Sequence, residues 1–279
     1  MTDRVLALKH RALCTRQPGD PAAATLLAAS RSQTEGEPEV IRQAKALAHY
    51  YRHQAVTIYE GELLVGSRPG QITEAEPITP QVFGRCPWQP PNPAYWPTPA
   101  DTHVFWTEGV FASAGNHTTL DYTTIFTGGF AGLRARIADR LTRLRDEDPE
   151  FSRKRDFLLA LQIVAEGFIA LSGRYATAAE RQAAECADPA RREELLTIAR
   201  NCRRVPEHPP TNFWEACQCA WFSFYFLPDA PGRVDQYVGP FYDRDLAAGA
   251  LTPEFAKELL SCLWLKVFAY AGAASIGVR

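Results

Sequence analysis

The segment that most constrains the fold is TNFWEACQCAWFSFYFLP, residues 211–228. It opens with a threonine, a residue that commonly caps helices, and the positions that follow are apolar nearly all round. A helix of that composition is stable in water only when other elements cover every side of it. We therefore expect a buried helix here, with the rest of the chain packed around it.

Apolar residues recur at three- and four-residue intervals through much of the remaining chain, as in amphipathic helices. This pattern predicts helices over residues 2–14, 21–32, 38–54, 120–145, 151–186, 189–202, 241–248 and 252–269. β-Branched and aromatic residues over 56–66 predict a short extended pair around a turn. The proline-rich stretch 67–99 is expected to be a long loop packed on the body of the protein or on a partner. No βαβ alternation occurs, so the visible chain is predicted to be mainly α.

Composition excludes several classes of function. The formal charge of −2 comes from 30 basic and 32 acidic residues without a sustained block of one sign, so no nucleic-acid partner is expected. No apolar run reaches the length that spans a bilayer, so we expect no membrane partner and a cytoplasmic location. Seven scattered cysteines, an odd number, favour reduced thiols over a disulfide framework.

Two polar clusters stand out, SAGNHTTLDY at 113–122 and PDAPGRVDQYVGPFYDRD at 228–245. The first has two interpretations: its Asn, Thr and Asp residues cap a helix, or the cluster faces a substrate. The second follows the buried helix, where a rigid element would anchor a functional loop.

Two other constellations are weaker. Cys217 and Cys219, with Cys202 and His208 nearby, are better explained as buried thiols than as a zinc site, because residues two apart on a helix point away from each other. Glu60 and Glu62 alternate beside a turn, where carboxylates are usually solvated, so an acid/base pair there is disfavoured.

Six motifs occur in an order that resembles a known family. They are EGELLVG at 60–66, the run 115–121 followed by GGFAGL at 128–133, RYATAA at 174–179, IARNCRRVPEHPPTNFWEACQ at 198–218, GRVDQYVGPFYDRD at 232–245 and ELLSCLWLK at 258–266. Together they resemble the N-terminal part of the pyruvate formate-lyase-like glycyl radical enzymes, in the branch of dehydratases, lyases and decarboxylases.

The resemblance implies the N-terminal portion of a ten-stranded α/β barrel, with residues 1–279 supplying a helical shell and part of a half-barrel. In that family a radical stored on a glycine generates a cysteine thiyl, which takes hydrogen from the substrate. His117 matches the substrate-contacting imidazole, although Asn116 stands where the family often has glycine. Asp229 matches an acidic or hydroxyl contact before the Gly-Arg-x-Asp-Gln-Tyr motif.

The chain departs from the family in two motifs. Neither Gly-Cys-x-Glu, for the thiyl and base, nor Arg-Val-x-Gly-Tyr, for the radical glycine, occurs in the 279 residues. We therefore expect no direct cofactor and no turnover by the isolated chain. The complete enzyme, a radical lyase, dehydratase or formate acetyltransferase-like enzyme, would need a radical-SAM iron-sulfur activase and a small-molecule substrate, with a homodimer as one assembly.

Two alternatives stay open. One is a non-catalytic helical scaffold or binding protein derived from that family. The other is a plain helical domain in which the motifs are coincidental. The tail VFAYAGAASIGVR is apolar and has no helix-stop signal, which suggests a frame change or truncation near Lys266 and predicts a partly exposed core.

Overall fold

The computed structural model describes residues 1–14, 22–67, 119–226 and 230–275. Within these ranges the chain forms helices joined by turns and irregular segments, and no residue lies in a named β-strand. The helices are α1 (Asp3–Cys14), α2 (Ala23–Gln33), α3 (Glu39–His53), α6 (Tyr122–Thr142), α7 (Phe151–Glu185), α8 (Pro189–Arg204), α9 (Phe213–Phe226), α10 (Val234–Ala247) and α11 (Pro253–Ser275). The mainly α prediction is confirmed for this part of the chain, which does not itself show a barrel.

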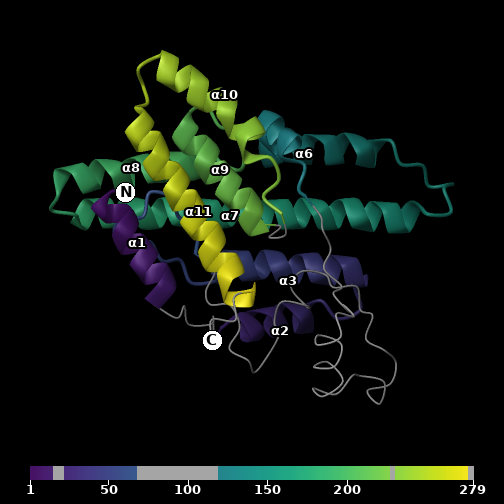
Figure 1. Cartoon of the computed structure of the whole chain (residues 1–279). Helices are drawn as coiled ribbons and strands as arrows, with labels where there is room; N and C mark the ends of the chain where they lie inside the picture. Colours follow the sequence, from purple (N-terminus) through teal and green to yellow (C-terminus); the bar gives the residue numbers. More distant parts are fainter. Residues whose placement is uncertain (15–21, 68–118, 227–229, 276–279) are drawn as a thin grey trace, which may run out of the picture.

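Helix α9 is at the centre of the core, as its composition predicts. Every residue of α9 is buried except Trp214 and Phe226, and α6, α8, α10 and α11 pack against it. The long α7 runs across the molecule, with α3 and α8 along it (Figure 1). Phe168 links α7 to α9, because its ring meets that of Phe222 in α9 edge-on at 5.9 Å.

Among the described helices, α7 alone is long and apolar enough to cross a membrane. Core helices of soluble proteins have the same properties, so this is weak evidence for a membrane segment. Phe168, Leu171 and Tyr175 of α7 are buried in the main hydrophobic core.

Helix α6 is kinked at Gly129, inside the GGFAGL motif. Gly129 has φ of 63°, and a Cβ at this position would clash with the carbonyl group of Glu207. The kink lets the next two backbone N–H groups leave the helical pattern. Phe130 donates to the Pro206 carbonyl and Ala131 to the Glu207 carbonyl, both at 2.9 Å. This joins α6 to the turn that follows α8.

The predicted extended pair over 56–66 is wrong. This segment is irregular, although the predicted turn is present and the Glu62 N–H donates to the Tyr59 carbonyl at 3.2 Å. Side chains take the place of a neighbouring strand: the Gln218 amide bonds both the N–H and the carbonyl of Val65, each at 2.9 Å. The strand-like composition therefore reflects burial, not pairing in a sheet.

Two helices extend beyond their predicted bounds. Helix α10 begins at Val234 instead of residue 241, and α11 continues to Ser275 instead of residue 269. Pro240 lies inside α10, where it removes one backbone donor. Packing on α9 offsets that loss, because Val238 is buried and the rings of Tyr242 and Phe213 meet edge-on at 5.7 Å. The loop predicted over 67–99 lies outside the described residues, apart from its first residue.

Candidate functional site

The two polar clusters come together at a parallel β-bridge between Thr119 and Ala230. Thr119 belongs to the first cluster and lies three residues before the start of α6, and Ala230 belongs to the second and lies four residues before the start of α10. The predicted substrate contacts His117 and Asp229 lie outside the described residues. The structure thus places Thr119 and Ala230, which are close to these two residues in the sequence, side by side.

Aromatic packing fixes the two helix starts relative to each other. The rings of Tyr122 in α6 and Tyr237 in α10 stack with centroids 4.2 Å apart and planes 6° apart. Gly232 permits the close approach: its φ is 63°, and a Cβ there would lie 2.9 Å from Cγ2 of Thr119. The Tyr237 hydroxyl donates to the Pro231 carbonyl at 2.7 Å. The segment that contains Ala230 is therefore tied to α10 by a side-chain hydrogen bond.

Both tyrosines stay neutral at physiological pH. Burial raises the pKa of Tyr122 to about 12, partly offset by the neighbouring Tyr237 hydroxyl. Burial also raises the pKa of Tyr237, and the proximity of Tyr122 adds to the increase. With pKa values raised in this way, neither hydroxyl can act as a general base near neutral pH.

Asp121 caps helix α6. Its carboxylate accepts the Thr124 N–H at 3.1 Å and the Thr124 hydroxyl at 2.6 Å. The side-chain hydrogen bond from Thr124 is the main cause of the lowered pKa of Asp121. The capping interpretation is confirmed for this residue, which is exposed at the surface.

Most of the second cluster is helical instead of forming a functional loop. Arg233 and Asp235 pair at 2.8 Å in solvent. Asp245, near the end of the motif, accepts the Phe213 N–H at 2.6 Å and so satisfies a donor in the first turn of α9. Of the described residues in the cluster, 230–233 are non-helical and lie before α10, next to the bridge.

Glu62 belongs to a buried ionic cluster that sequence patterns do not reveal. Glu60 is exposed, as predicted, whereas Glu62 has only 2% of its surface accessible, so its predicted solvation is wrong. Its carboxylate binds Arg11 at 3.0 Å and Lys266 at 2.8 Å. Because the partners come from α1 and α11, no local signal in the sequence could identify them.

Free thiols occur at Cys186, Cys202, Cys217, Cys219 and Cys262. Cys202, Cys217 and Cys219 are buried, and burial raises the pKa of Cys219 to about 12. No group of three or more His, Cys, Asp or Glu side chains in the described ranges could hold a metal ion. The prediction that these thiols are buried is confirmed for Cys202, Cys217 and Cys219.

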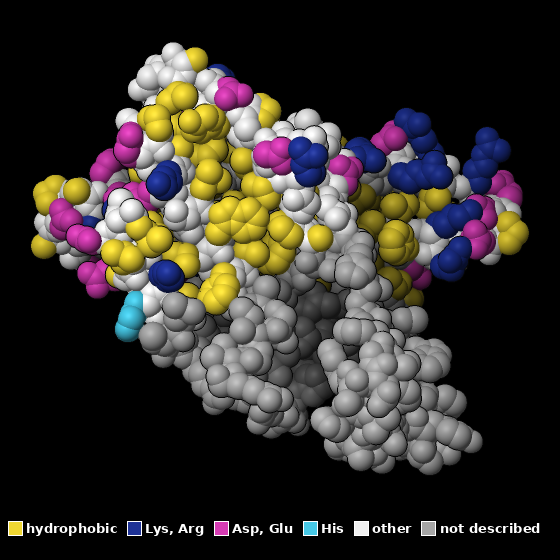
Figure 2. Space-filling view, in the orientation of Figure 1, with side chains coloured by type: hydrophobic (Ala, Val, Ile, Leu, Met, Phe, Trp, Pro, Cys, Tyr) yellow, Lys and Arg dark blue, Asp and Glu magenta, His cyan; other side chains and the backbone are white. Residues whose placement is uncertain are grey.

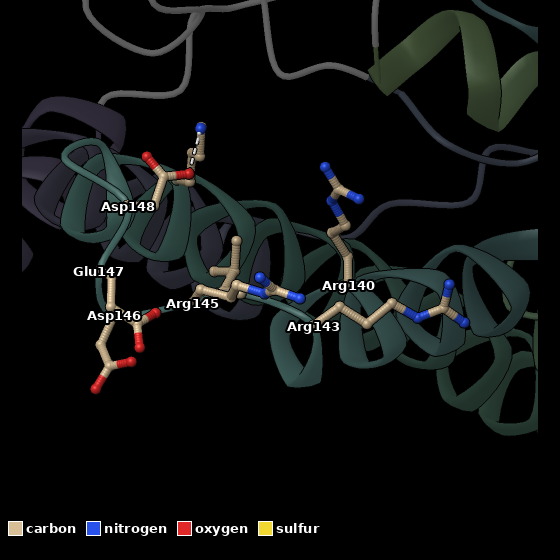
Figure 3. Close-up of a pocket in the computed structure, with 8 residues that line it drawn as sticks. Arg140, Arg143, Arg145, Asp146, Glu147 and Asp148 are labelled. Atoms are coloured by element: carbon tan, nitrogen blue, oxygen red, sulfur yellow. Dashed lines mark hydrogen bonds and ion pairs between the residues drawn. The ribbon is translucent and has the colours of Figure 1, made fainter.

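A surface hollow of about 780 Å³ lies at the turn between α6 and α7 (Figure 3). Its lining carries both signs of charge: Arg140, Arg143, Leu144, Arg145, Asp146, Glu147, Asp148 and Lys154. Local pairs neutralise part of it, since Lys154 binds Asp148 at 2.6 Å and Arg143 binds Asp139 at 2.7 Å. We assign it no substrate, because it is open to solvent and has little apolar lining.

Comparison with known proteins identifies the family. A family model described as pyruvate formate lyase-like matches residues 1–88 and 95–277. The chain belongs to this family. The resemblance drawn from the sequence motifs is therefore confirmed.

The relatives are radical lyases and dehydratases. Isethionate sulfite-lyase of Desulfovibrio desulfuricans is 30% identical over 295 residues, covering 85% of this chain and 35% of its own. Trans-4-hydroxy-L-proline dehydratase of Clostridioides difficile is 28% identical, covering 91% of this chain and 38% of its own. A structure reported for 1,2-propanediol dehydration in Roseburia inulinivorans has a TM-score of 0.77 and 29% identity, covering 95% of this chain and 39% of its own. The chain thus spans well under half the length of these relatives.

Proposed function

We propose that this chain is the N-terminal segment of a glycyl radical enzyme that cleaves a C–O, C–N or C–C bond in a small molecule. Membership of the family supports the reaction class, and the relatives named above are lyases and dehydratases. The substrate would be a small hydroxylated, amino or carboxylated compound. Sulfite release from a small sulfonate, by cleavage of a C–S bond, is added to these reactions, because relatives are named isethionate sulfite-lyases.

The observation that carries the proposal is the bridge between Thr119 and Ala230. His117 precedes Thr119 by two positions, and Asp229 directly precedes Ala230. The two predicted substrate contacts come from distant motifs, yet both are close in sequence to this one backbone bridge. This supports a common site. In this proposal the imidazole of His117 hydrogen-bonds a substrate hydroxyl or carboxylate, and the Asp229 carboxylate orients a hydroxyl or amine.

The radical chemistry is assigned to sequence beyond these 279 residues, because they contain neither Gly-Cys-x-Glu nor Arg-Val-x-Gly-Tyr. The glycyl radical, installed by a radical-SAM activase, would supply the hydrogen-abstracting group. The part described here would bind and orient the substrate, and its buried aromatic residues would exclude water.

The test uses the complete enzyme, with the coding sequence that follows codon 279 or an adjacent gene. We expect that sequence to encode both missing motifs. After anaerobic activation the complete enzyme should give a glycyl-radical doublet in electron paramagnetic resonance and turn over a member of the substrate set. The 279-residue chain alone should give no doublet. A complete protein without either motif, with no turnover, would favour the non-catalytic scaffold.

A further inference from the structure

Two histidines lie together at the C-terminal end of α3. His49 and His53 are one helical turn apart, and their ring centroids are 4.1 Å apart with planes inclined at 32°. His49 is half-buried and His53 is exposed. Residues at positions i and i+4 share one face of a helix, so both imidazoles face the same side.

A hydrogen bond determines the tautomer of His53. Its Nδ1 lies 2.8 Å from the carbonyl oxygen of His49. A carbonyl oxygen only accepts, so Nδ1 carries the proton. In the neutral ring Nε2 then keeps the lone pair. Metal-binding histidines commonly donate their other ring N–H to a backbone carbonyl, because this fixes the ring and raises the basicity of the ligating nitrogen.

We propose that His49 and His53 form a two-imidazole chelate for a divalent transition-metal ion, with Cu²⁺ bound most tightly. The i,i+4 spacing is the one by which two histidines on a helix bind one metal ion. Imidazole is a borderline-soft ligand that suits Cu²⁺, Ni²⁺ and Zn²⁺, and affinity in this series is highest for Cu²⁺. This inference does not rest on the proposed function.

The ligand atoms and the neighbouring cations define which ions the pair accepts. Arg52 is adjacent, and Arg174 of α7 donates to the Tyr51 carbonyl at 3.1 Å. These cations oppose the binding of any metal ion by charge alone. The pair offers nitrogen ligands only, so hard ions such as Mg²⁺ and Ca²⁺, which take oxygen ligands, are disfavoured.

The remaining coordination positions of the metal ion stay open. No third His, Cys, Asp or Glu joins the pair among the residues that the structure describes. Water, or an external ligand, would complete the coordination shell, as in metal sites that keep an exchangeable position.

The experiment is a calorimetric titration of the 279-residue protein with Cu²⁺, followed by Mg²⁺. We expect Cu²⁺ binding at a 1:1 ratio and no Mg²⁺ binding at this pair. His49→Gln and His53→Gln should each weaken Cu²⁺ binding by about tenfold or more, because each leaves a single imidazole. His10→Gln, at an exposed single histidine of α1, is the matched control and should leave the affinity unchanged.

A second measurement needs no variant. In nuclear magnetic resonance, paramagnetic Cu²⁺ should broaden signals of residues around 49–53 at substoichiometric concentration. Equal affinity in His53→Gln and in the unaltered protein would overturn the proposal. Broadening that avoids α3, or no Cu²⁺ binding at all, would also overturn it.

Discussion

Glu62 and Lys266, 204 positions apart in the chain, form an ion pair at 2.8 Å in the protein interior. Their side chains are 2% and 11% exposed. The Lys266 ammonium also donates to the Gly66 carbonyl at 3.3 Å and lies 3.4 Å from the Ser67 hydroxyl. This contact joins the EGELLVG motif to the last turn of ELLSCLWLK. It anchors the irregular segment 56–67 on α11.

Replacing Glu62 by Gln should be strongly destabilising. The change removes the partner of two buried or half-buried cations, and breaking a buried ion pair costs about 3–5 kcal/mol. Lys266→Met should cost less, because Arg11 still neutralises Glu62. Free energies of unfolding from urea titration measure both. Glu60→Gln, two positions away in solvent, is the control and should stay within about 0.5 kcal/mol. Equal effects of Glu60→Gln and Glu62→Gln would contradict the role of the cluster.

Gly129→Ala should destabilise the protein by about 2 kcal/mol or more. The new Cβ meets the Glu207 carbonyl, and φ of 63° is strained for alanine. At Gly132, one turn later in the same helix, an added Cβ would meet no neighbouring group within 4 Å. Gly132→Ala should therefore stabilise α6 by up to about 1 kcal/mol. Thermal unfolding of the two variants checks the opposite signs, and a shared sign would argue against the kink.

The apolar patterns predicted the core more successfully than they predicted the irregular segment. The buried helix at 211–228 was identifiable because its composition is a local property that needs no knowledge of its partners. The extended pair predicted over 56–66 is wrong because the hydrogen-bond partners of this segment, such as Gln218 and Trp221, lie more than 150 positions away. Burial of Glu62 was missed for the same reason.

Only part of the candidate site could be predicted from the sequence. Capping by Asp121 follows from residue type and position, and the structure confirms it. The pairing of Thr119 with Ala230 has no local signal in the sequence, because neither residue type indicates which residue it pairs with. His117 and Asp229 rest on the family resemblance, and both remain predictions.

The helix cap makes a pH-dependent prediction. The folded-state pKa of Asp121 is lowered below 3.8 by its hydrogen bonds to Thr124. Its contribution to stability is therefore fully present above the unfolded pKa and is lost as pH falls through the folded pKa. Asp121→Ala should cost about 1 kcal/mol at pH 7. The cost should shrink toward pH 3, as measured by denaturant unfolding at each pH. A cost independent of pH would show that the carboxylate charge is not involved.

The face formed by α10 and α11 should favour self-association of the isolated chain. Figure 2 shows hydrophobic side chains gathered over these helices, and Trp264 of α11 is 49% exposed. Contiguous exposed apolar surface favours association. Trp264→Arg should reduce hydrophobic-dye binding and self-association, while changing stability by at most about 0.5 kcal/mol. Phe157→Arg, at an exposed position of α7, is the control for charge. A sharp monomer by light scattering that binds no dye would contradict this prediction.

In the complete enzyme, His117→Ala should lower turnover by about 100-fold or more and leave the melting temperature nearly unchanged. The reason is that an imidazole in hydrogen-bonding contact with the substrate acts on binding and rate, not on folding. Asp121→Asn is the matched variant four positions away: its oxygen still caps α6, so stability should fall by at most about 1 kcal/mol and turnover should persist. A histidine bonded only within the core would give the reverse ordering for His117→Ala, a clear loss of stability with little specific loss of rate. Rates under anaerobic activation, compared with unfolding midpoints for both variants, separate the two roles. A stable, fully active His117→Ala enzyme would remove His117 from the site.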